Sequence, residues 1–277
     1  MIQAPAIQME PSFEAGRAGR LFSLRVSPAG CLPKGGILYL PPYGEEMHKS
    51  RRMAALQARR FAADGWLVQQ FDHYGCGDSD GDSGDGHWEL WREDACLMLR
   101  RLRASVEGPL LLWGLRLGGA LAADVSRTET VETLILWQPV ISGEQYLNHL
   151  LRLKLAGDLI KSGQPRHSVG ALRNQLGRGL ALEIAGNRLS PALAGFLTGY
   201  SLAASPPPGR AIWMEVVARP DADLSAPSAR CIESWQAAGV TLTIRRAACP
   251  NFWQSQEIQE CAALVEATSE TLGHQLP

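Results

Sequence analysis

The sequence lacks several features that would place it in a large class of proteins. No segment approaches the roughly 18 consecutive apolar residues that a membrane-spanning helix requires. The 27 Lys and Arg residues nearly balance the 28 Asp and Glu residues, so no basic excess favours nucleic acid or an anionic membrane surface. Residues 1–20 contain no apolar stretch typical of a secretory signal. We therefore predict no transmembrane segment and no nucleic-acid partner.

Paired cysteines are also missing. None of the six cysteines forms a Cys-x-x-Cys pair, and they are widely scattered: Cys31, Cys76, Cys96, Cys231, Cys249 and Cys261. Structural zinc sites usually contain such pairs, so we expect no metal site, and nothing in the sequence indicates a cofactor. The irregular spacing is typical of reduced thiols, which predicts a cytoplasmic protein.

Short apolar runs alternate with longer amphipathic stretches. This pattern is typical of βαβ units, so we predict an α/β fold with a mostly parallel central sheet flanked by helices. The expected strands are 21–28 (at an edge or in a hairpin), 35–41, 66–72, 109–114, 133–139, 211–218 and 240–246. The expected helices are 47–63, 88–104, 117–126, 225–238 and 254–272.

Residues 141–208 interrupt the alternation. They are rich in Leu, Arg and Gly, with helical pieces at 146–161 and 190–204 and no obvious strand. We predict a core formed by 1–140 and 209–277, with 141–208 inserted as a helical cap over one end of the sheet. Alternatively, these are surface helices without a role in substrate binding, since apolar side chains at helical spacing more often pack against a core.

Residues 114–118 are the most informative segment. Gly114-Leu115-Arg116-Leu117-Gly118 follows an apolar strand and precedes a helix. This resembles the Gly-x-Ser-x-Gly turn that carries the nucleophile of α/β-hydrolases, but Arg116 occupies the serine position. A guanidinium group stays protonated and has no free lone pair, so it cannot attack a carbonyl. We predict an α/β-hydrolase fold without the usual nucleophile.

Two further loops support this fold. Residues 41–46 follow an apolar strand, where α/β-hydrolases place one N–H donor of the oxyanion hole; the second donor belongs to the residue after the nucleophile. The resemblance assigns these donors to Tyr43 and Leu117. Residues 72–79 match a structural Asp-x-x-Gly-x-Gly-x-Ser loop, and the aspartates that follow, Asp80, Asp82 and Asp85, predict a solvated acidic loop without metal.

Three segments together resemble one narrower family. PPYGEEMHKSRRMAALQARRFA, FDHYGCGDSDG and WGLRLGG are similar to the type 2 hydrolases associated with the exosortase A system of exopolysaccharide-producing bacteria. The resemblance is strongest over residues 20–145. It implies genomic association with exopolysaccharide and protein-sorting machinery, and it implies that arginine at the turn is a family trait.

The rest of a serine triad is incomplete. The acid position follows strand 211–218, where Asp221 and Asp223 are candidates. The histidine position follows strand 240–246, and residues 247–253 contain no histidine. We keep open three substitutes for the missing groups: Cys249 as a thiolate nucleophile, His48 as a base, and His73 or His87 acting with Asp78 or Asp85.

Arg116 itself permits two main interpretations. Beside the positive end of a helix, it could bind a phosphate, a carboxylate or an acidic sugar. Alternatively it forms an internal salt bridge, and the candidate acids are Asp221, Asp223, Glu45 and Glu46; a third possibility is exposure to solvent. The residues that could border the same pocket are Glu45, Glu46, His48 and Asn251.

Three functions follow. The first is a degenerate hydrolase that binds an anionic or acyl ligand. The second is an active esterase or thioesterase that uses a relocated nucleophile or direct attack by water, since oxyanion donors alone supply some transition-state stabilisation. The third is a non-enzymatic partner of exopolysaccharide machinery that docks through the cap.

Overall fold

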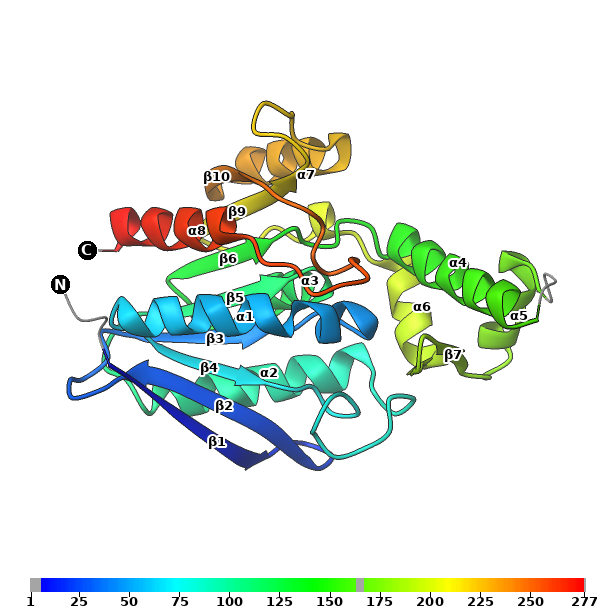
Figure 1. The fold of residues 1–277 in the computed structure, drawn as a ribbon, viewed down its shortest axis with the longest axis horizontal. Coiled ribbons are helices and arrows are strands. Elements are labelled where there is room, and N and C mark those ends of the chain that lie inside the picture. The colour runs from blue at the N-terminus through cyan, green and yellow to red at the C-terminus, as the bar shows by residue number, and fades with distance from the viewer. Residues whose placement is uncertain (1–5, 163–166, 277) are drawn as a thin grey trace.

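The computed structural model describes residues 6–162 and 167–276. Its centre is an eight-stranded sheet in the order β1-β2-β4-β3-β5-β6-β9-β10 (Figure 1). β1 and β2 pair antiparallel, as do β2 and β4, and the remaining pairs are parallel. The strands are β1 (Ile7–Ala15), β2 (Arg20–Pro28), β3 (Gly36–Leu40), β4 (Leu67–Phe71), β5 (Leu110–Leu115), β6 (Thr133–Trp137), β9 (Arg210–Val217) and β10 (Thr241–Ala248). This mostly parallel sheet confirms the predicted fold class.

Helices cover both faces of the sheet. α1 (Glu45–Ala63) and α8 (Ala262–Gln275) contribute to one buried apolar cluster, while α2 (Trp88–Arg103), α3 (Leu117–Val125) and α7 (Ala226–Ala237) contribute to another. Because successive side chains of a strand point to opposite faces, Leu112 of β5 joins the second cluster and Trp113 joins the first. The alternating sheet and helix pattern therefore produces two cores with the sheet between them.

A segment inserted between β6 and β9 lies beside the carboxyl ends of the parallel strands (Figure 1). We call residues 141–208 the insert. It contains α4 (Gly143–Ser162), α5 (Val169–Gly177), β7 (Leu182–Ile184), β8 (Asn187–Leu189), α6 (Pro191–Gly199) and a short 3-10 helix (Leu202–Ala204). The expectation of no strand here is wrong, because β7 and β8 pair into a hairpin. Strands of three residues are too short to show an alternating pattern.

Hydrogen bonds fix the insert to the core. The Tyr43 hydroxyl donates to the carbonyl of Arg188 at 3.0 Å, and the Arg188 N–H donates to the Ser83 hydroxyl at 2.9 Å. The Ser190 hydroxyl donates to the carbonyl of Gly86 at 2.8 Å. The apolar side chains at helical spacing on α4 pack inward, since Leu147, Leu150 and Leu151 are buried in the core cluster. Its role as a cap over a ligand stays a prediction.

The chain departs from the sequence-based expectations at both ends. β1 was hidden from the pattern because it is an edge strand whose large apolar residues, Met9 and Phe13, are exposed. The helix expected at 254–272 begins only at Ala262, and residues 249–261 form a loop after β10. A disulfide between Cys249 and Cys261 closes this loop, with 5.8 Å between the two Cα atoms.

This disulfide corrects the expectation that every cysteine is a reduced thiol. The loop after β10 folds back and brings together two residues that are 12 positions apart. Cys31, Cys76, Cys96 and Cys231 are free, and Cys31 is the exposed one of these four. Burial raises the pKa of the Cys76 thiol to about 12, so this thiol stays protonated.

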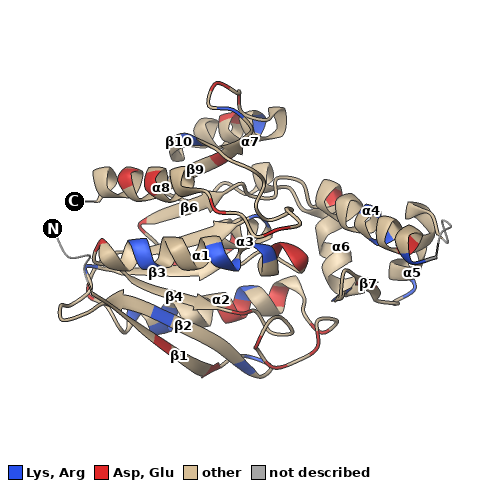
Figure 2. Ribbon diagram, in the orientation of Figure 1, with Lys and Arg blue, Asp and Glu red and all other residues tan. Residues whose placement is uncertain are grey.

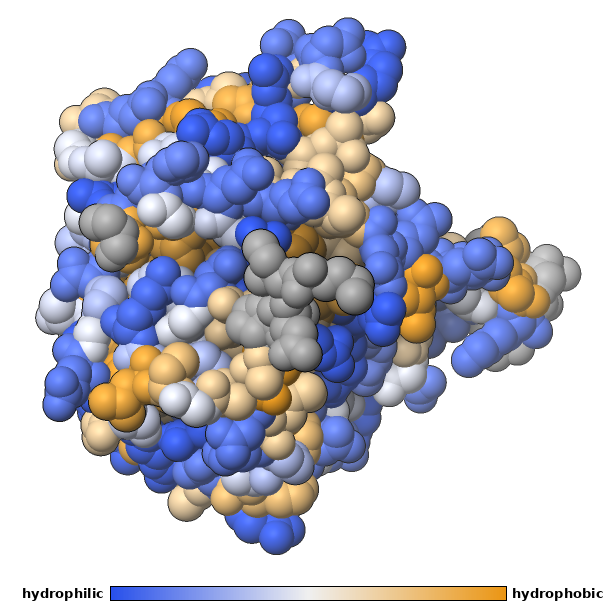
Figure 3. Space-filling model, turned by 60° about the vertical axis from the view of Figure 1, so that its left-hand side comes forward, coloured by the Kyte–Doolittle hydropathy of each residue, from blue (hydrophilic) through white to orange (hydrophobic). Residues whose placement is uncertain are grey.

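In the views of Figures 2 and 3, charged residues of both signs and apolar residues are intermixed among the elements drawn. Acidic and basic residues are interspersed over the helices, as on α1 (Figure 2). On the face drawn in Figure 3, apolar residues form small groups separated by hydrophilic ones. Across residues 6–162 and 167–276, every helix is too short or too polar to cross a lipid bilayer.

Candidate functional site

The turn between β5 and α3 has the sharp geometry expected of a nucleophile-bearing turn. Arg116, between Leu115 and Leu117, has φ 54° and ψ −118°, in a region that residues other than glycine rarely adopt. A Cβ atom at Gly118 would collide with the carbonyl oxygens of Leu40 and Pro41, and one at Gly114 would collide with the carbonyl of Gly118. The glycine frame is therefore required by close backbone contacts, and the backbone forms this turn around an arginine.

The side chain of Arg116 makes an internal ion pair. Its Nε atom lies 3.1 Å from Oε1 of Glu46, in the first turn of α1, and its Nη1 atom donates to the carbonyl of Gln138 at 3.3 Å. The exposed fractions of the two charged side chains are 16% and 7%. Because charged groups taken from water need compensation, a pair this buried depends on both partners.

Two aromatic side chains complete the surroundings of this pair. The guanidinium carbon of Arg116 lies 5.3 Å from the ring centre of Trp253 and 5.9 Å from that of Tyr146. The Tyr146 hydroxyl donates to Oε2 of Glu46 at 3.0 Å. Burial raises the pKa of Tyr146 well above its ordinary value, so the hydroxyl remains a donor. The turn, α1, the loop after β10 and α4 of the insert thus meet at one ion pair.

The four acids proposed as partners of Arg116 have different fates. Glu46 is the observed partner, while Glu45 pairs with Lys49 at 3.0 Å. Asp221 is exposed and lies 3.5 Å from Arg219, and Asp223 is exposed as well. Both aspartates lie in the irregular stretch after β9, whereas Glu46 is one residue inside a helix that starts directly across from the turn.

The loop after β10 supplies an aromatic ring where a triad would have histidine. Trp253 is buried, and its ring faces the guanidinium of Arg116. On the acid side, Glu215 of β9 is buried but already accepts hydrogen bonds from Trp213 Nε1 and the Ser228 hydroxyl, both at 2.9 Å. This loop contains no histidine that the Glu215 carboxylate could orient.

The substitutes considered for the missing groups lie elsewhere or are unavailable. Cys249 is in the disulfide, so its proposed role as a thiolate is wrong for this structure. His48 is exposed on α1, and Nδ1 of His87 accepts from the Leu90 N–H at the start of α2. His73 is buried against Trp91, and burial lowers its pKa to about 4. His73 is therefore a neutral core residue at ordinary pH.

The loop at 72–79 has the structural role expected of it. The Asp72 carboxylate pairs with Arg51 at 2.8 Å and accepts from the Asp78 N–H at 3.0 Å. The Ser79 hydroxyl donates to the carbonyl of Asp72 and accepts from the Phe22 N–H, so it connects the loop to β2. Further along, Asp80 pairs with Arg20 at the surface.

The two residues assigned to an oxyanion hole flank the turn. Leu117 is the first residue of α3, and the first N–H groups of a helix have no acceptor inside it. Tyr43 is buried, with its hydroxyl used by the insert and its ring 5.7 Å from that of Trp91. Their roles as backbone donors to an oxyanion stay predictions.

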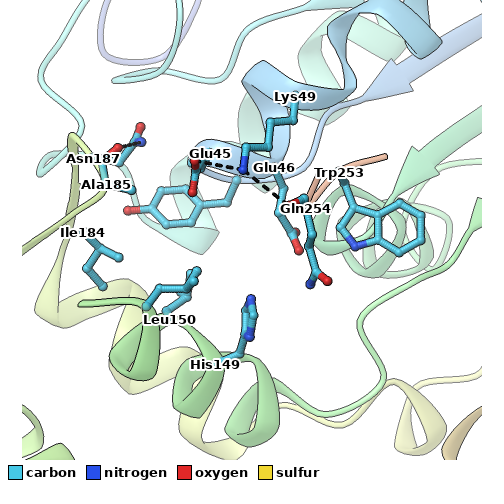
Figure 4. Close-up of a pocket in the computed structure, with 13 residues that line it drawn as sticks. Glu45, Glu46, Lys49, His149, Leu150, Ile184, Ala185, Asn187, Trp253 and Gln254 are labelled. Atoms are coloured by element: carbon cyan, nitrogen blue, oxygen red, sulfur yellow. Dashed lines mark hydrogen bonds and ion pairs between the residues drawn. The ribbon is translucent and has the colours of Figure 1, made fainter. Parts of the chain in front are cut away.

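A cavity of about 270 Å³ lies between α1, the insert and the loop after β10 (Figure 4). Its apolar wall comes from Leu150 and Leu153 of α4, Ile184 of β7, Tyr43 and Trp253. The polar residues at its border are Glu45, Glu46, Lys49, His149, Asn187 and Gln254. Two more hollows, of about 320 and 240 Å³, have Arg116 in their walls, which the first cavity does not. Asn251, exposed, borders the larger of these two.

Several of these residues had no signal in the sequence. Tyr146, His149 and Leu150 lie on α4, about 30 positions after Arg116, and helical periodicity indicates only that a stripe is buried. Trp253 lies within residues 247–253, where a triad would have its histidine, and an aromatic residue there could have indicated a cation–π partner for arginine.

The sheet order, the turn after β5 and the placement of the loops define an α/β-hydrolase. The chain belongs to the serine aminopeptidase S33 family, whose family model matches residues 35–180, more than half of the sequence. The human mitochondrial palmitoyl-protein thioesterase ABHD10 is 34% identical over 103 residues, which cover 36% of this chain and 32% of that protein. The chain thus matches about a third of the length of this curated relative.

Solved structures show the same fold. The Est1E structure with bound ferulic acid, from Butyrivibrio proteoclasticus, matches with a TM-score of 0.66 and 14% identity, over 96% of this chain and 99% of that one. Mouse α/β hydrolase domain-containing protein 10 matches with a TM-score of 0.56 and 18% identity, over 97% and 100% of the two chains. At these identities the likeness extends to the fold alone.

Proposed function

We propose that this α/β-hydrolase has lost serine catalysis and uses the cavity between α1 and the insert to bind a neutral ligand with an apolar chain, such as an acyl group. The observation that carries this proposal is the ion pair of Arg116 and Glu46 at the turn where the family has its nucleophile. The guanidinium can hold negative charge but cannot form a covalent intermediate.

The neighbours of Arg116 support a site adapted to arginine. Glu46 balances its charge, Trp253 and Tyr146 offer ring faces, and the carbonyl of Gln138 accepts a hydrogen bond. An arginine left by a recent loss of serine would lack such a set of partners. We infer that the whole site has changed together, in agreement with an arginine that is a family trait.

The charges around the cavity favour a neutral ligand over the anion that the sequence alone suggests. Lys49 is paired with Glu45, and Arg116 is paired with Glu46. A carboxylate or phosphate would have to displace one of these acids and leave it without a partner, which is costly in a partly buried site. Burial lowers the pKa of His149, so this side chain adds no positive charge at neutral pH.

The acyl character comes from the apolar wall and agrees with one relative. The human protein's name assigns it a palmitoyl-protein substrate, and the wall built from Leu150, Leu153 and Ile184 suits a hydrocarbon chain here. From the resemblance of the sequence motifs, we further propose that the protein acts with exopolysaccharide machinery. In this setting the insert is the proposed contact surface for a protein partner.

Two assays test the loss of catalysis. A fluorophosphonate probe should not label the protein, and p-nitrophenyl decanoate should not be hydrolysed above the rate of a heat-denatured control. Arg116→Ser should gain neither property, because the loop after β10 supplies Trp253 where a serine triad has its histidine. Ester turnover that survives Arg116→Ala and disappears when another residue is replaced would instead establish the second function, a relocated nucleophile or water attack.

Binding of 1-decanol, measured by calorimetry, tests the ligand class. Leu153→Glu places a charge in the apolar wall and should abolish binding. Leu159→Glu is the matched control, because Leu159 is an exposed leucine of the same helix that does not border the cavity. Tighter binding of decanoate than of decanol would contradict the preference for a neutral ligand.

A further inference from the structure

The hollow of about 240 Å³ on the far side of Arg116 has a different character from the apolar cavity. Its walls include uncharged polar side chains from four separate segments: Gln138 after β6, Ser142 and Gln145 at the start of α4, Ser225 before α7 and Gln254 after β10. No carboxylate side chain borders it among the residues that the structure describes. Amides and hydroxyls each offer both donors and acceptors, which complement hydroxyl groups better than ions.

This polar hollow and the apolar cavity are neighbours. His149 and Gln254 border both of them, so the two spaces share a wall. Arg116 borders only the polar side, while its partner Glu46 borders only the apolar side. The ion pair therefore stands between a region suited to hydrocarbon and a region suited to hydrogen bonds.

Gln138 provides an independent sign of a built site. Its φ is 41°, in the left-handed region that non-glycine residues rarely occupy. Three hydrogen bonds hold it there: its side-chain Oε1 accepts from the Val216 N–H at 2.7 Å, its N–H donates to the carbonyl of Met214 at 3.0 Å, and its carbonyl accepts from Arg116. Backbone strain of this kind concentrates at ligand-binding positions, where surrounding contacts impose it.

We propose that the site binds an amphipathic molecule, with its apolar chain in the cavity of Leu150 and Leu153 and an uncharged, polyhydroxylated head group in the hollow of Gln138, Gln145 and Gln254. The inference rests on the proposed function for the chain and adds the chemistry of the head. A glycosylated or otherwise hydroxylated lipid has both parts, whereas a free fatty acid has only the first.

Calorimetry with four probes below their micelle concentrations separates the contributions: 1-decanol, decyl β-D-glucoside, methyl β-D-glucoside and decyl phosphate. The glucoside with the decyl chain should bind about tenfold more tightly than decanol, the effect of roughly one added hydrogen bond of ordinary strength. Methyl glucoside should bind weakly, and decyl phosphate should bind less tightly than decyl glucoside.

Variants then test whether the head group binds in the polar hollow. Gln145→Leu, at a residue that borders the polar hollow and not the apolar cavity, should lower the affinity for decyl glucoside toward that for decanol and leave decanol binding unchanged. Gln236→Leu, at an exposed glutamine of α7 outside both spaces, is the matched control and should change neither.

The outcomes distinguish the two proposals. Equal affinities for decyl glucoside and decanol in the unmodified protein, or a glucoside preference that is undiminished in Gln145→Leu, would overturn this inference and leave the proposed function standing. Tighter binding of decyl phosphate would also overturn it in favour of an anionic head. Absence of binding by every decyl probe would overturn the proposed function itself.

Discussion

The turn between β5 and α3 and the loop after β10 lie at the same edge of the sheet, but they have diverged in different ways. The turn keeps the backbone of a hydrolase, with Arg116 at φ 54° between two glycines that tolerate no side chain. The loop has no histidine, and it is closed by the disulfide of Cys249 and Cys261. One region has the backbone geometry of a nucleophile turn with an arginine in it, while the other lacks the histidine and carries a disulfide.

The two changes are complementary in space. Trp253 of the loop faces the guanidinium at the turn, so the residue in the histidine region contacts the residue in the serine region, as it would in a working triad. The turn and the loop thus still meet, as they do in a triad, although the residues that meet no longer perform its chemistry. Function therefore has to be argued from the side chains of the site and not from the fold.

The largest effect is expected when the charge at the turn is removed. Arg116→Ala leaves the Glu46 carboxylate buried without its cation, and we expect a loss of about 3–5 kcal/mol in the free energy of unfolding. Urea denaturation measures this loss. Adding Glu46→Gln to the variant should restore a substantial part of it, because the uncompensated charge disappears.

The control for that variant is Arg219→Ala, which breaks the exposed pair with Asp221 and should change stability little. If Arg116→Ala costs no more than this control, the ion pair does not organise the turn.

The second test concerns the loop after β10. Replacing Cys249 and Cys261 together by serine removes a cross-link over 12 positions, and we expect a loss of about 3 kcal/mol in the free energy of unfolding. Reducing agent should lower the melting temperature of the unmodified protein in the same direction. Cys31→Ser, at an exposed free thiol, serves as the control; a protein indifferent to reductant would show that the loop does not need its bridge.

The third test concerns His73, which was one of the candidates for the missing base and which lies buried in the core. Burial lowers its folded pKa to about 4, against about 6.5 in the unfolded chain, so the unfolded state binds more protons between these values. Stability should therefore fall as the pH drops below about 6.5 and continue to fall until it passes about 4.

The contribution of this single group between pH 8 and pH 5 is about 2 kcal/mol. His73→Phe should reduce the pH dependence of urea unfolding by that amount. An unchanged pH dependence in the variant would mean that His73 is protonated, or exposed to water, in the folded protein.

The smallest effect is expected where the insert meets the turn. Tyr146→Phe removes the hydroxyl that donates to Glu46, and we expect a loss of about 1.5 kcal/mol in the free energy of unfolding, as for a hydrogen bond to a charged group. Tyr200→Phe removes a hydroxyl that donates to the carbonyl of Ala120 at 3.3 Å, a neutral acceptor, and should cost less. The reverse order would separate Tyr146 from the ion pair.

Local patterns in the sequence were sufficient for most of the core. The strands and helices of the sheet recur with regular spacing, because buried parallel strands require continuous apolar runs and their covering helices require one apolar face. β1 escaped this logic because its exposed side chains follow no burial pattern, and the hairpin of β7 and β8 escaped it because of its short strands. The start of α8 was misplaced since the disulfide loop before it shows no local signal.

The sequence by itself determined that a glycine-framed turn carries an arginine and that no histidine follows the last strand, since both are statements about local order along the chain. Only the tertiary structure decided that Glu46 is the partner of Arg116, that Trp253 and Tyr146 enclose the pair, and that Cys249 meets Cys261. The physical reason is that these contacts join residues from separate elements, and their distances depend on how the sheet, the helices and the insert pack together.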